Sequence, residues 1–322
     1  MVPQPGWDDD DVIPDDIDDS GNLVLATRGS PLAIAQAKEV AMTLVAASGG
    51  MFTPPDLLVI KTSGDLIQDR PLAEAGGKGL FTKEIDEALF GEHADIAVHS
   101  MKDLPTELPE GIVIGAVLAR EDPRDVLIGA ASIAELPKCS RLGTSSLRRA
   151  AQVRSRRPDV SIVSLRGNVQ TRIQKIQDGA AEATLLALAG LNRLRLDTSA
   201  YAVLDVGEML PAAAQGAIAI TCRADDAATL RMLQIINHAN SERAVAAERA
   251  LLAALEGSCR TPIAALAEIE DGVLTLRAAV LAPDGSKRYD AERRGSDKDA
   301  EVMGRDAGEE LRRRAGPNFF TT

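Results

Sequence analysis

The sequence is poor in aromatic residues and contains no long apolar run. Aromatics make up 2% of its 322 residues, with one Trp, two Tyr and five Phe. Proteins that bind single-stranded nucleic acid stack bases on aromatic side chains, and the net charge of -12 also opposes a phosphate backbone. No apolar stretch approaches the about 18 residues of a membrane span. These shortages predict that neither nucleic acid nor a membrane is a partner.

Cysteine and histidine are scarce as well, with three residues of each type. Their scattered positions argue against a disulfide framework and against a zinc site, so no metal is expected. Cys139 and Cys222 lie beside or within apolar strand patterns, which predicts that both are buried core residues. Cys259 follows a helix-ending glycine and precedes Arg260, and a neighbouring cation favours the nucleophilic thiolate. The alternative for Cys259 is a further core cysteine.

Two familiar catalytic motifs are missing. The stretch GGKG at residues 76–79 suggests a phosphate-binding loop, but Lys78 is followed by glycine instead of serine or threonine, and the spaced first glycine is absent. The Gly-x-Ser-x-Gly elbow of serine hydrolases does not occur either. We therefore expect residues 76–79 to form a mobile, basic loop that precedes a helix over residues 80–90.

Acidic residues are concentrated at the start of the chain, where eight Asp lie between residues 8 and 19. Such a block repels itself, which predicts a disordered, dispensable tail over residues 1–21. The tail has neither the basic start and apolar centre of a signal peptide nor the composition of a transit peptide. Together with the odd number of cysteines, this predicts a cytoplasmic protein.

The pattern of apolar runs predicts an α/β fold. Strands are expected at residues 23–26, 57–60 and 96–98, separated by helices at 31–47 and 80–90, which implies a parallel sheet. Ser30 and Pro31 are suited to the N-cap and first position of the earlier helix. Residues 112–118 form a further apolar run, after which we place a crossover near Arg120.

A second unit repeats this pattern. Its expected strands lie at residues 126–128, 160–165 and 183–188, and residues 142–146 are expected to lead into a helix. The strand at residues 215–220 is expected to return to the first sheet, so that two hinge strands join two lobes. A third unit is expected from a helix at 242–255, a hairpin around Asp271 and Gly272, a further strand and a helix at 298–314. The predicted domains are residues 22–120 with 214–238, residues 121–213, and residues 239–322.

A charged pair, Lys102 and Asp103, lies just past the carboxyl end of the strand at 96–98. Pro105 disfavours helix at Leu104, which predicts an extended turn. Open α/β sheets bind their ligands at this edge, so residues 100–103 are a candidate reaction site. The alternative is a solvated charge pair at a strand end.

Basic residues are concentrated in the second unit, where residues 143–195 contain ten Arg or Lys and three Asp or Glu. Guanidinium groups bind carboxylates and phosphates through two parallel hydrogen bonds, so the cluster predicts an anionic ligand. Arginines at strand-to-helix junctions, the ligand edge of such a sheet, are Arg28, Arg148, Arg149, Arg166 and Arg193. Arg154, Arg156 and Arg157 lie farther along a helix and are predicted to form a solvated face.

Six strings, in this order, resemble the porphobilinogen deaminase family, whose members are also called hydroxymethylbilane synthases. They are ATRGSPLA at 26–33, GGKGLFTKE at 76–84, VHSMKDLP at 98–105, GTSSLRR at 143–149, LRGNV at 165–169 and GSCRTPI at 257–263. Any one string is weak, but together they are specific, and the similarity runs from about residue 23 to the final helix.

The resemblance implies two lobes like those of periplasmic solute-binding proteins and a small α+β C-terminal domain. It also implies the head-to-tail condensation of four porphobilinogen molecules into hydroxymethylbilane, with release of ammonia, in tetrapyrrole and haem biosynthesis. A dipyrromethane cofactor would be attached to Cys259 through a thioether. A monomer is expected, which passes its product to a later tetrapyrrole enzyme.

The family's roles fall on this sequence as follows. The resemblance makes Asp103 the catalytic carboxylate, assisted by Lys102. Cofactor contacts are then expected from Cys259, Ser100, Lys102, Asp103, Thr144, Ser146, Arg148, Arg149 and Gly167. Substrate contacts are expected from Arg28, Ser30, Lys78, Phe81, Arg149, Arg166, Arg172, Arg193 and Gln215. The alternative from another class is a two-lobed anion-binding protein without covalent chemistry, which would have no need of Cys259.

Overall fold

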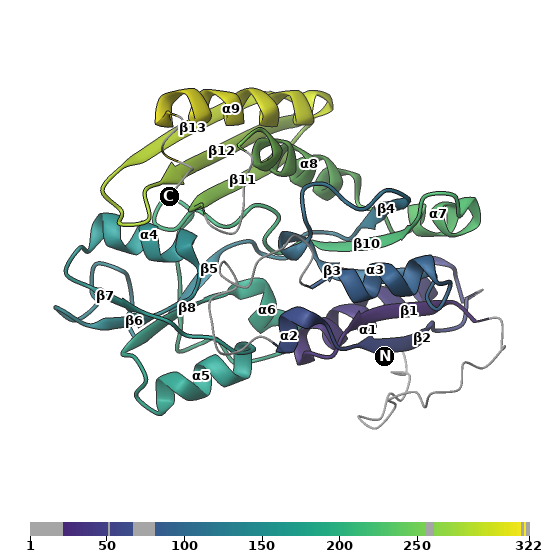
Figure 1. Cartoon of the computed structure of the whole chain (residues 1–322), viewed down its shortest axis with the longest axis horizontal. Coiled ribbons are helices and arrows are strands. Elements are labelled where there is room, and N and C mark those ends of the chain that lie inside the picture. Colours follow the sequence, from purple (N-terminus) through teal and green to yellow (C-terminus); the bar gives the residue numbers. More distant parts are fainter. Residues whose placement is uncertain (1–21, 51, 67–80, 256–260, 317–318, 320–322) are drawn as a thin grey trace.

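The computed structural model describes residues 22–50, 52–66, 81–255, 261–316 and 319. Figure 1 shows two lobes side by side, with a C-terminal unit lying above both. The acidic tail, Lys78 and Cys259 lie outside the described residues, so the expectations for them stay predictions. Two α/β lobes with a small α+β unit are the predicted fold class, which is confirmed.

The first lobe is built on a five-stranded sheet in the order β2-β1-β3-β10-β4. Its strands are β1 (Val24–Arg28), β2 (Asp56–Ile60), β3 (Ile96–Ser100), β4 (Ile112–Val117) and β10 (Ile218–Arg223). The first three strands are parallel, and β10 lies antiparallel between β3 and β4. The strand expected to return to the first sheet therefore does so.

The described part of the first lobe contains four α-helices: α1 (Pro31–Ala47), α2 (Ser63–Leu66), α3 (Lys83–Phe90) and α7 (Ala227–Gln234). The start of α1 is as predicted, because Pro31 is its first residue and the Ser30 hydroxyl accepts a hydrogen bond from the Ala33 amide at 3.2 Å. The α3 helix begins at Lys83, later than the predicted position 80, because Phe81 and Thr82 form a turn.

The second lobe has a sheet of the same design, in the order β7-β6-β8-β5-β9. Its strands are β5 (Asp125–Ile128), β6 (Arg141–Gly143), β7 (Ser161–Val163), β8 (Ala183–Ala187) and β9 (Ala202–Val203). Strands β7, β6 and β8 are parallel, and β5 is antiparallel to β8. Its helices are α4 (Leu147–Arg156), α5 (Val169–Gln177) and α6 (Leu188–Arg193).

The chain crosses between the lobes twice, before β5 and before β10, and the two crossings pack against each other. Gly216 has φ of +90°, and a Cβ there would lie 2.3 Å from the carbonyl oxygen of Glu121. Only glycine allows this approach without strain. The amide of Glu121 also donates to the Gly216 carbonyl at 3.3 Å. The lobes are therefore joined by a close-packed double connection.

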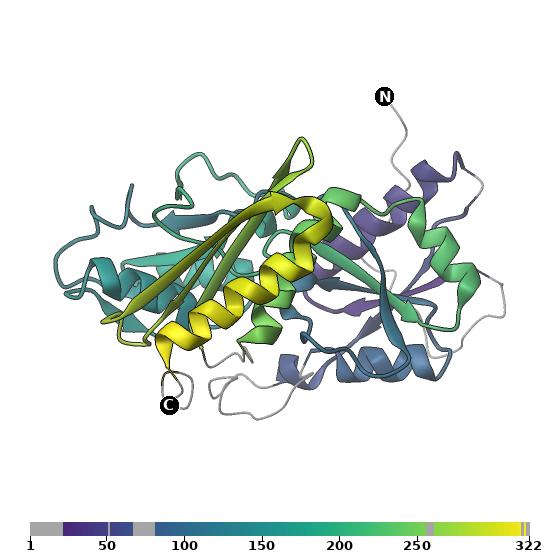
Figure 2. The same ribbon diagram turned by 90° about the horizontal axis from the view of Figure 1, so that it is seen from above.

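The C-terminal unit consists of an antiparallel three-stranded sheet and two helices. They are α8 (Ala239–Ala254), β11 (Ile263–Glu270), β12 (Val273–Leu281), β13 (Arg288–Ser296) and α9 (Ala300–Ala315). The predicted hairpin is confirmed, because Asp271 and Gly272 both have positive φ between β11 and β12. Figure 2 shows α9 lying across the sheet. The exact domain boundaries stay a prediction.

Two expectations were wrong. Residues Met101–Asp103 form a 3-10 turn instead of an extended one, and the chain becomes extended only at Leu104, next to Pro105. Cys139 is exposed instead of buried, because it lies with φ of +58° in a turn before β6. Cys222 is buried on β10 as predicted, and burial raises the pKa of its thiol to about 11. The short elements α2, α6 and β9 were not anticipated.

None of the described helices combines the length and the apolar character that crossing a membrane would require.

Candidate active site

The turn after β3 presents a charged pair where the two lobes meet. The Met101 amide donates to the Ala217 carbonyl at 3.0 Å, and the Leu104 amide closes the turn onto the Met101 carbonyl at 3.1 Å. Met101 and Leu104 are buried, whereas Lys102 and Asp103 between them are exposed. Buried apolar residues thus anchor the turn on both sides and leave the ammonium and carboxylate free to face a ligand. Residues 101–104 are called the catalytic turn below.

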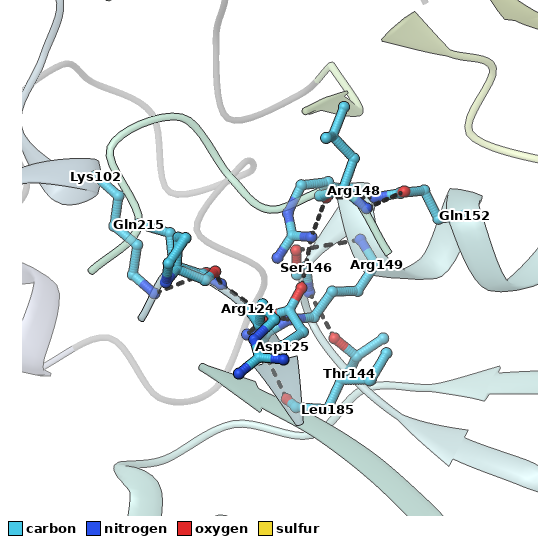
Figure 3. A network of polar contacts seen from close by, with 12 residues as sticks. Lys102, Arg124, Asp125, Thr144, Ser146, Arg148, Arg149, Gln152, Leu185 and Gln215 are labelled. Atoms are coloured by element: carbon cyan, nitrogen blue, oxygen red, sulfur yellow. Dashed lines mark hydrogen bonds and ion pairs between the residues drawn. The ribbon is translucent and has the colours of Figure 1, made fainter. Parts of the chain in front are cut away.

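Lys102 reaches from the first lobe toward the second. Its Nζ lies 3.4 Å from Oε1 of Gln215, whose Nε2 donates to Oδ1 of Asp125 at 2.9 Å (Figure 3). Lys102 is exposed as a residue, but its ammonium group is surrounded by protein atoms. This burial lowers the pKa of the ammonium to about 8. The positive charge of Arg149 acts in the same direction, while Asp103 opposes it. Lys102 is therefore placed to exchange a proton near neutral pH.

Asp125, which the sequence analysis missed, is the centre of the second lobe's polar network. It is fully buried at the start of β5 and binds Nη1 of Arg148 and Nη2 of Arg149, each at 2.7 Å. Burial opposes ionisation of Asp125, but the two guanidinium groups hold its pKa well below the usual range. The sequence feature that could have pointed to this network is an Asp immediately before an apolar strand. A carboxylate at such a position is buried only if it is paired with a positive charge.

Arg148 and Arg149, predicted to bind an anionic ligand, are thus largely engaged inside the lobe. Arg149 also donates to the Leu185 carbonyl at 2.8 Å (Figure 3). Arg148 donates to the Leu210 carbonyl at 2.7 Å. Burial lowers the pKa of Arg148, and its Nε is a buried donor that has no hydrogen-bond partner among the described residues. The network fixes both guanidinium groups and leaves the Nε of Arg148 unsatisfied.

Arg172 on α5 faces the catalytic turn from the second lobe. Its Nε donates to the Gly167 carbonyl at 2.8 Å, which fixes the stem of the side chain. Burial lowers the pKa of Arg172 to about 10, with contributions from the positive charges of Arg149 and Arg166, while the negative charge of Asp103 opposes the shift. The charges of Arg149, Arg166 and Asp103 therefore all act on the guanidinium of Arg172.

Arg193 on α6 pairs with Glu39 on α1, and this ion pair links the two lobes. Its Nε lies 2.8 Å from a carboxylate oxygen of Glu39, and its side chain is 6% exposed. Its Nη2 is buried without a hydrogen-bond partner in the described part of the chain. An unsatisfied buried guanidinium N–H is costly, so it marks a place that a carboxylate would fill.

The residues predicted on the first lobe gather around the carboxyl ends of β1 and β3. The guanidinium carbon of Arg28 lies 4.1 Å from the centre of the Phe81 ring. His99 is buried beside them, and burial together with the charge of Arg28 lowers its pKa to about 4. The Ser100 hydroxyl donates to Oε1 of Gln36 at 2.9 Å. Ser30 is occupied as the cap of α1.

Thr144, Ser146 and Gly167 lie at two helix starts on the second lobe. The Ser146 hydroxyl accepts from the Arg149 amide at 3.4 Å, and the Thr144 hydroxyl accepts from the Ser146 amide at 3.1 Å. Gly167 has φ of +118°, and a Cβ there would lie within 2.9 Å of the Thr171 side chain. Helix starts favour anions, so both sites suit a carboxylate.

The prediction of a solvated face formed by Arg154, Arg156 and Arg157 is right for Arg156 alone, and Arg157 lies just after the end of α4. Arg156 is exposed, whereas Arg154 and Arg157 are half-buried. Arg154 donates to the Pro283 carbonyl at 2.9 Å and so ties the second lobe to the C-terminal unit, and Arg157 pairs with Asp159 at 2.7 Å. Among the described residues, no group of His, Cys, Asp and Glu could hold a metal ion.

Comparison with protein-family models decides the family. Residues 23–231 match the model described as "Porphobilinogen deaminase, dipyromethane cofactor binding domain", and residues 243–313 match "Porphobilinogen deaminase, C-terminal domain". The chain belongs to the porphobilinogen deaminase family. Porphobilinogen deaminase of Paracoccus denitrificans is 52% identical over 94% of this chain and 97% of its own length. The chloroplastic porphobilinogen deaminase of Oryza sativa is 52% identical over 92% of this chain and 85% of its own.

Among solved structures, the Bordetella pertussis BvgS periplasmic VFT2 domain is similar over 66% of this chain and 86% of that domain, with 12% identity and a TM-score of 0.37. A likeness at this level supports no functional argument.

The cofactor of porphobilinogen deaminases fits the residues that are present. A dipyrromethane carries several carboxylates, and in the part of the chain that the structure describes, Nε of Arg148 and Nη2 of Arg193 are among the buried donors without a partner. Arg166 and Arg172 add positive charge beside Asp103. The second lobe therefore supplies the cationic surroundings that this cofactor requires.

Proposed function

We propose that this protein is a hydroxymethylbilane synthase, which joins four porphobilinogen molecules head to tail and releases one ammonia at each condensation. The observation that carries the proposal is the position of Lys102 and Asp103, which face an arginine-rich second lobe in a chain of the porphobilinogen deaminase family. When bound, the dipyrromethane supplies the free pyrrole carbon to which the first substrate is joined.

Asp103 is proposed as the catalytic carboxylate. Loss of the amine from a pyrrole methylamine leaves a cation conjugated with the ring nitrogen, and a nearby carboxylate stabilises that positive charge. The same carboxylate can take up the proton that the attacked ring carbon loses when the new carbon–carbon bond has formed. Lys102, with a pKa of about 8, is proposed to protonate the departing amine or to hold Asp103 ionised.

The arginines are proposed to bind the acetate and propionate groups of the pyrroles. Among the described residues, Arg193 and Arg148 each have a buried N–H without a partner, so each can donate a hydrogen bond to a carboxylate without breaking an existing one. Arg28, Ser30, Phe81, Arg166 and Arg172 are further proposed substrate contacts. Cofactor contacts are proposed from Cys259, Ser100, Thr144, Ser146, Arg149 and Gly167, together with the catalytic pair.

Gln215 is proposed to act on substrate through Lys102. Its amide is buried and bridges the lysine of one lobe to Asp125 of the other. We further propose that the protein works in the cytoplasm as a monomer and passes its product to a later tetrapyrrole enzyme.

Two measurements test the proposal. The intact mass of purified protein should exceed that of the chain by two linked pyrrole units, and Cys259→Ser should remove this increment. Active protein with an unmodified mass would overturn the cofactor assignment. Asp103→Asn should keep the fold and the cofactor but lose nearly all turnover, because an amide cannot take up the proton. Near-normal turnover would remove Asp103 from the mechanism.

A further inference from the structure

The first helix of the C-terminal unit, α8, packs directly against the catalytic turn. Val245 lies in the same buried cluster as Met101 and Leu104, the two apolar residues that anchor the turn. Arg249 follows Val245 by four positions, so both side chains lie on one face of α8. A single helix face therefore contacts the segment that carries Lys102 and Asp103.

Arg249 binds the backbone immediately after the turn. Its Nη2 donates to the carbonyls of Pro105 at 2.8 Å and Thr106 at 3.0 Å. In the part of the chain that the structure describes, no carboxylate pairs with it, and burial lowers the pKa of its guanidinium. Both of these hydrogen bonds from the desolvated Arg249 guanidinium reach the loop that follows the catalytic turn. Arg249 therefore helps to hold that loop in position.

The helix itself is fixed by the residue next to Arg249. Glu248 is fully buried and pairs with Nη1 of Arg120 at 2.6 Å, near the crossing between the lobes. Its carboxylate also accepts hydrogen bonds from the amides of Ala214 and Ala267. The first of these amides precedes β10 and the second lies on β11, so α8 is held against both the lobe connection and its own sheet.

Along the sequence, α8 ends at Ala254, five positions before Cys259, the proposed attachment residue of the cofactor. We propose that Arg249 is a positioning residue, which fixes the catalytic turn relative to the C-terminal unit that carries Cys259. This inference rests on the proposed function, since it takes Asp103 as the catalytic carboxylate. Arg249 touches neither substrate nor cofactor in this assignment, and it acts through residues 101–106.

The expected effect is on turnover more than on substrate affinity. A displacement of a catalytic group by about 1 Å can cost about 100-fold in rate. We therefore expect Arg249→Leu to lower kcat by about 10- to 100-fold and to change KM by less than about 3-fold, because the arginines proposed to bind substrate lie on other elements. Arg249→Lys retains a cationic donor on a similar stem and should recover much of the loss.

Arg243→Leu is the matched control. Arg243 lies on the same helix and also loses a cationic contact when replaced, but its partner is Asp297 of the C-terminal unit, at 2.5 Å. The Arg243→Leu variant should therefore have the same kcat and KM as the parent protein. The cofactor content of each variant is measured by intact mass, so that a loss of turnover is not mistaken for a loss of cofactor.

The outcomes separate this inference from the proposed function. Parental kcat in cofactor-loaded Arg249→Leu, a change confined to KM, or an equal loss in Arg243→Leu would each overturn the positioning role. If the leucine variant does not fold, Arg249→Gln decides, and parental kcat in that variant overturns the inference. Asp103→Asn is measured in parallel: full turnover there refutes the proposed function, whereas its inactivity beside a normal Arg249→Leu refutes only the inference.

Discussion

Replacing Asp125 with Asn would test the buried network that fixes Arg148 and Arg149. The carboxylate is fully buried and forms ion pairs of 2.7 Å with both guanidinium groups. The amide is nearly isosteric but uncharged, so the variant leaves two buried cations without a counter-charge. Removing one partner of a buried ion pair typically costs about 3–5 kcal/mol, because the remaining charge is uncompensated. We expect Asp125→Asn to lower the free energy of unfolding at pH 7 by about that amount.

The assay is urea unfolding at 25 °C followed by far-ultraviolet circular dichroism, repeated between pH 7 and pH 3. The unfolded carboxyl has a pKa of about 3.9, and that of folded Asp125 lies well below the usual range. A depressed pKa stabilises the folded state above the unfolded pKa, and this contribution is lost as pH falls toward the folded pKa. The difference between the parent protein and Asp125→Asn should therefore shrink below about pH 4.

Glu182→Gln is the matched control, because Glu182 pairs with Arg141 at 2.6 Å in the same lobe but both side chains are largely exposed. Exposed ion pairs contribute little to the free energy of unfolding, so Glu182→Gln should not change that free energy resolvably. A loss below about 1 kcal/mol in Asp125→Asn, or a difference that stays constant from pH 7 to pH 3, would refute the reasoning.

Two further predictions concern the groups beside this network. The reaction of Lys102 with an amine reagent should have its midpoint near pH 8, because burial and the charge of Arg149 lower the pKa of Lys102 to about 8. Mass-spectrometric mapping of labelled lysines between pH 6 and pH 10 would measure this midpoint. Asp125→Asn should move that midpoint lower, since Asp125 raises the pKa of Lys102. A midpoint near 10.5 in the parent would contradict the first statement, and an unchanged or higher midpoint in Asp125→Asn would contradict the second. Arg193→Leu should raise KM by about 10-fold or more, because it removes a buried donor proposed to bind a substrate carboxylate. Glu39→Gln keeps that donor and should leave KM close to the parental value, so equal KM values in the two variants would count against the assignment.

Local features of the fold could be predicted from the sequence because each depends on neighbouring residues. Ser30 and Pro31 mark the start of α1, and Asp271 with Gly272 mark the hairpin of the C-terminal unit. The error at Cys139 has the same origin, because an apolar pattern beside a strand did not reveal the turn in which the residue lies.

The network around Asp125 could not be predicted in this way. Gln215 and Asp125 are 90 positions apart in the chain, and Arg149 is 24 positions from Asp125. Their meeting depends on how two lobes are joined, which no local pattern encodes. The predicted positions at strand-to-helix junctions are right for Arg28, which ends β1, and for Arg148 and Arg149 in the first turn of α4, but Arg193 lies at the far end of α6. The sequence also did not indicate that Arg148 and Arg149 are held by an internal carboxylate.

The insertion of β10 between β3 and β4 has a consequence for synthesis on the ribosome. Within the described sheet, β4 is hydrogen-bonded to β10 alone, and β10 begins about a hundred residues after β4 ends. The first lobe therefore emerges with β4 unpaired and with the β3 edge open, while the whole second lobe is still being made. Open strand edges favour pairing with other chains, so the nascent protein passes through an aggregation-prone stage. That stage ends only when β10 reaches the gap and completes the first sheet.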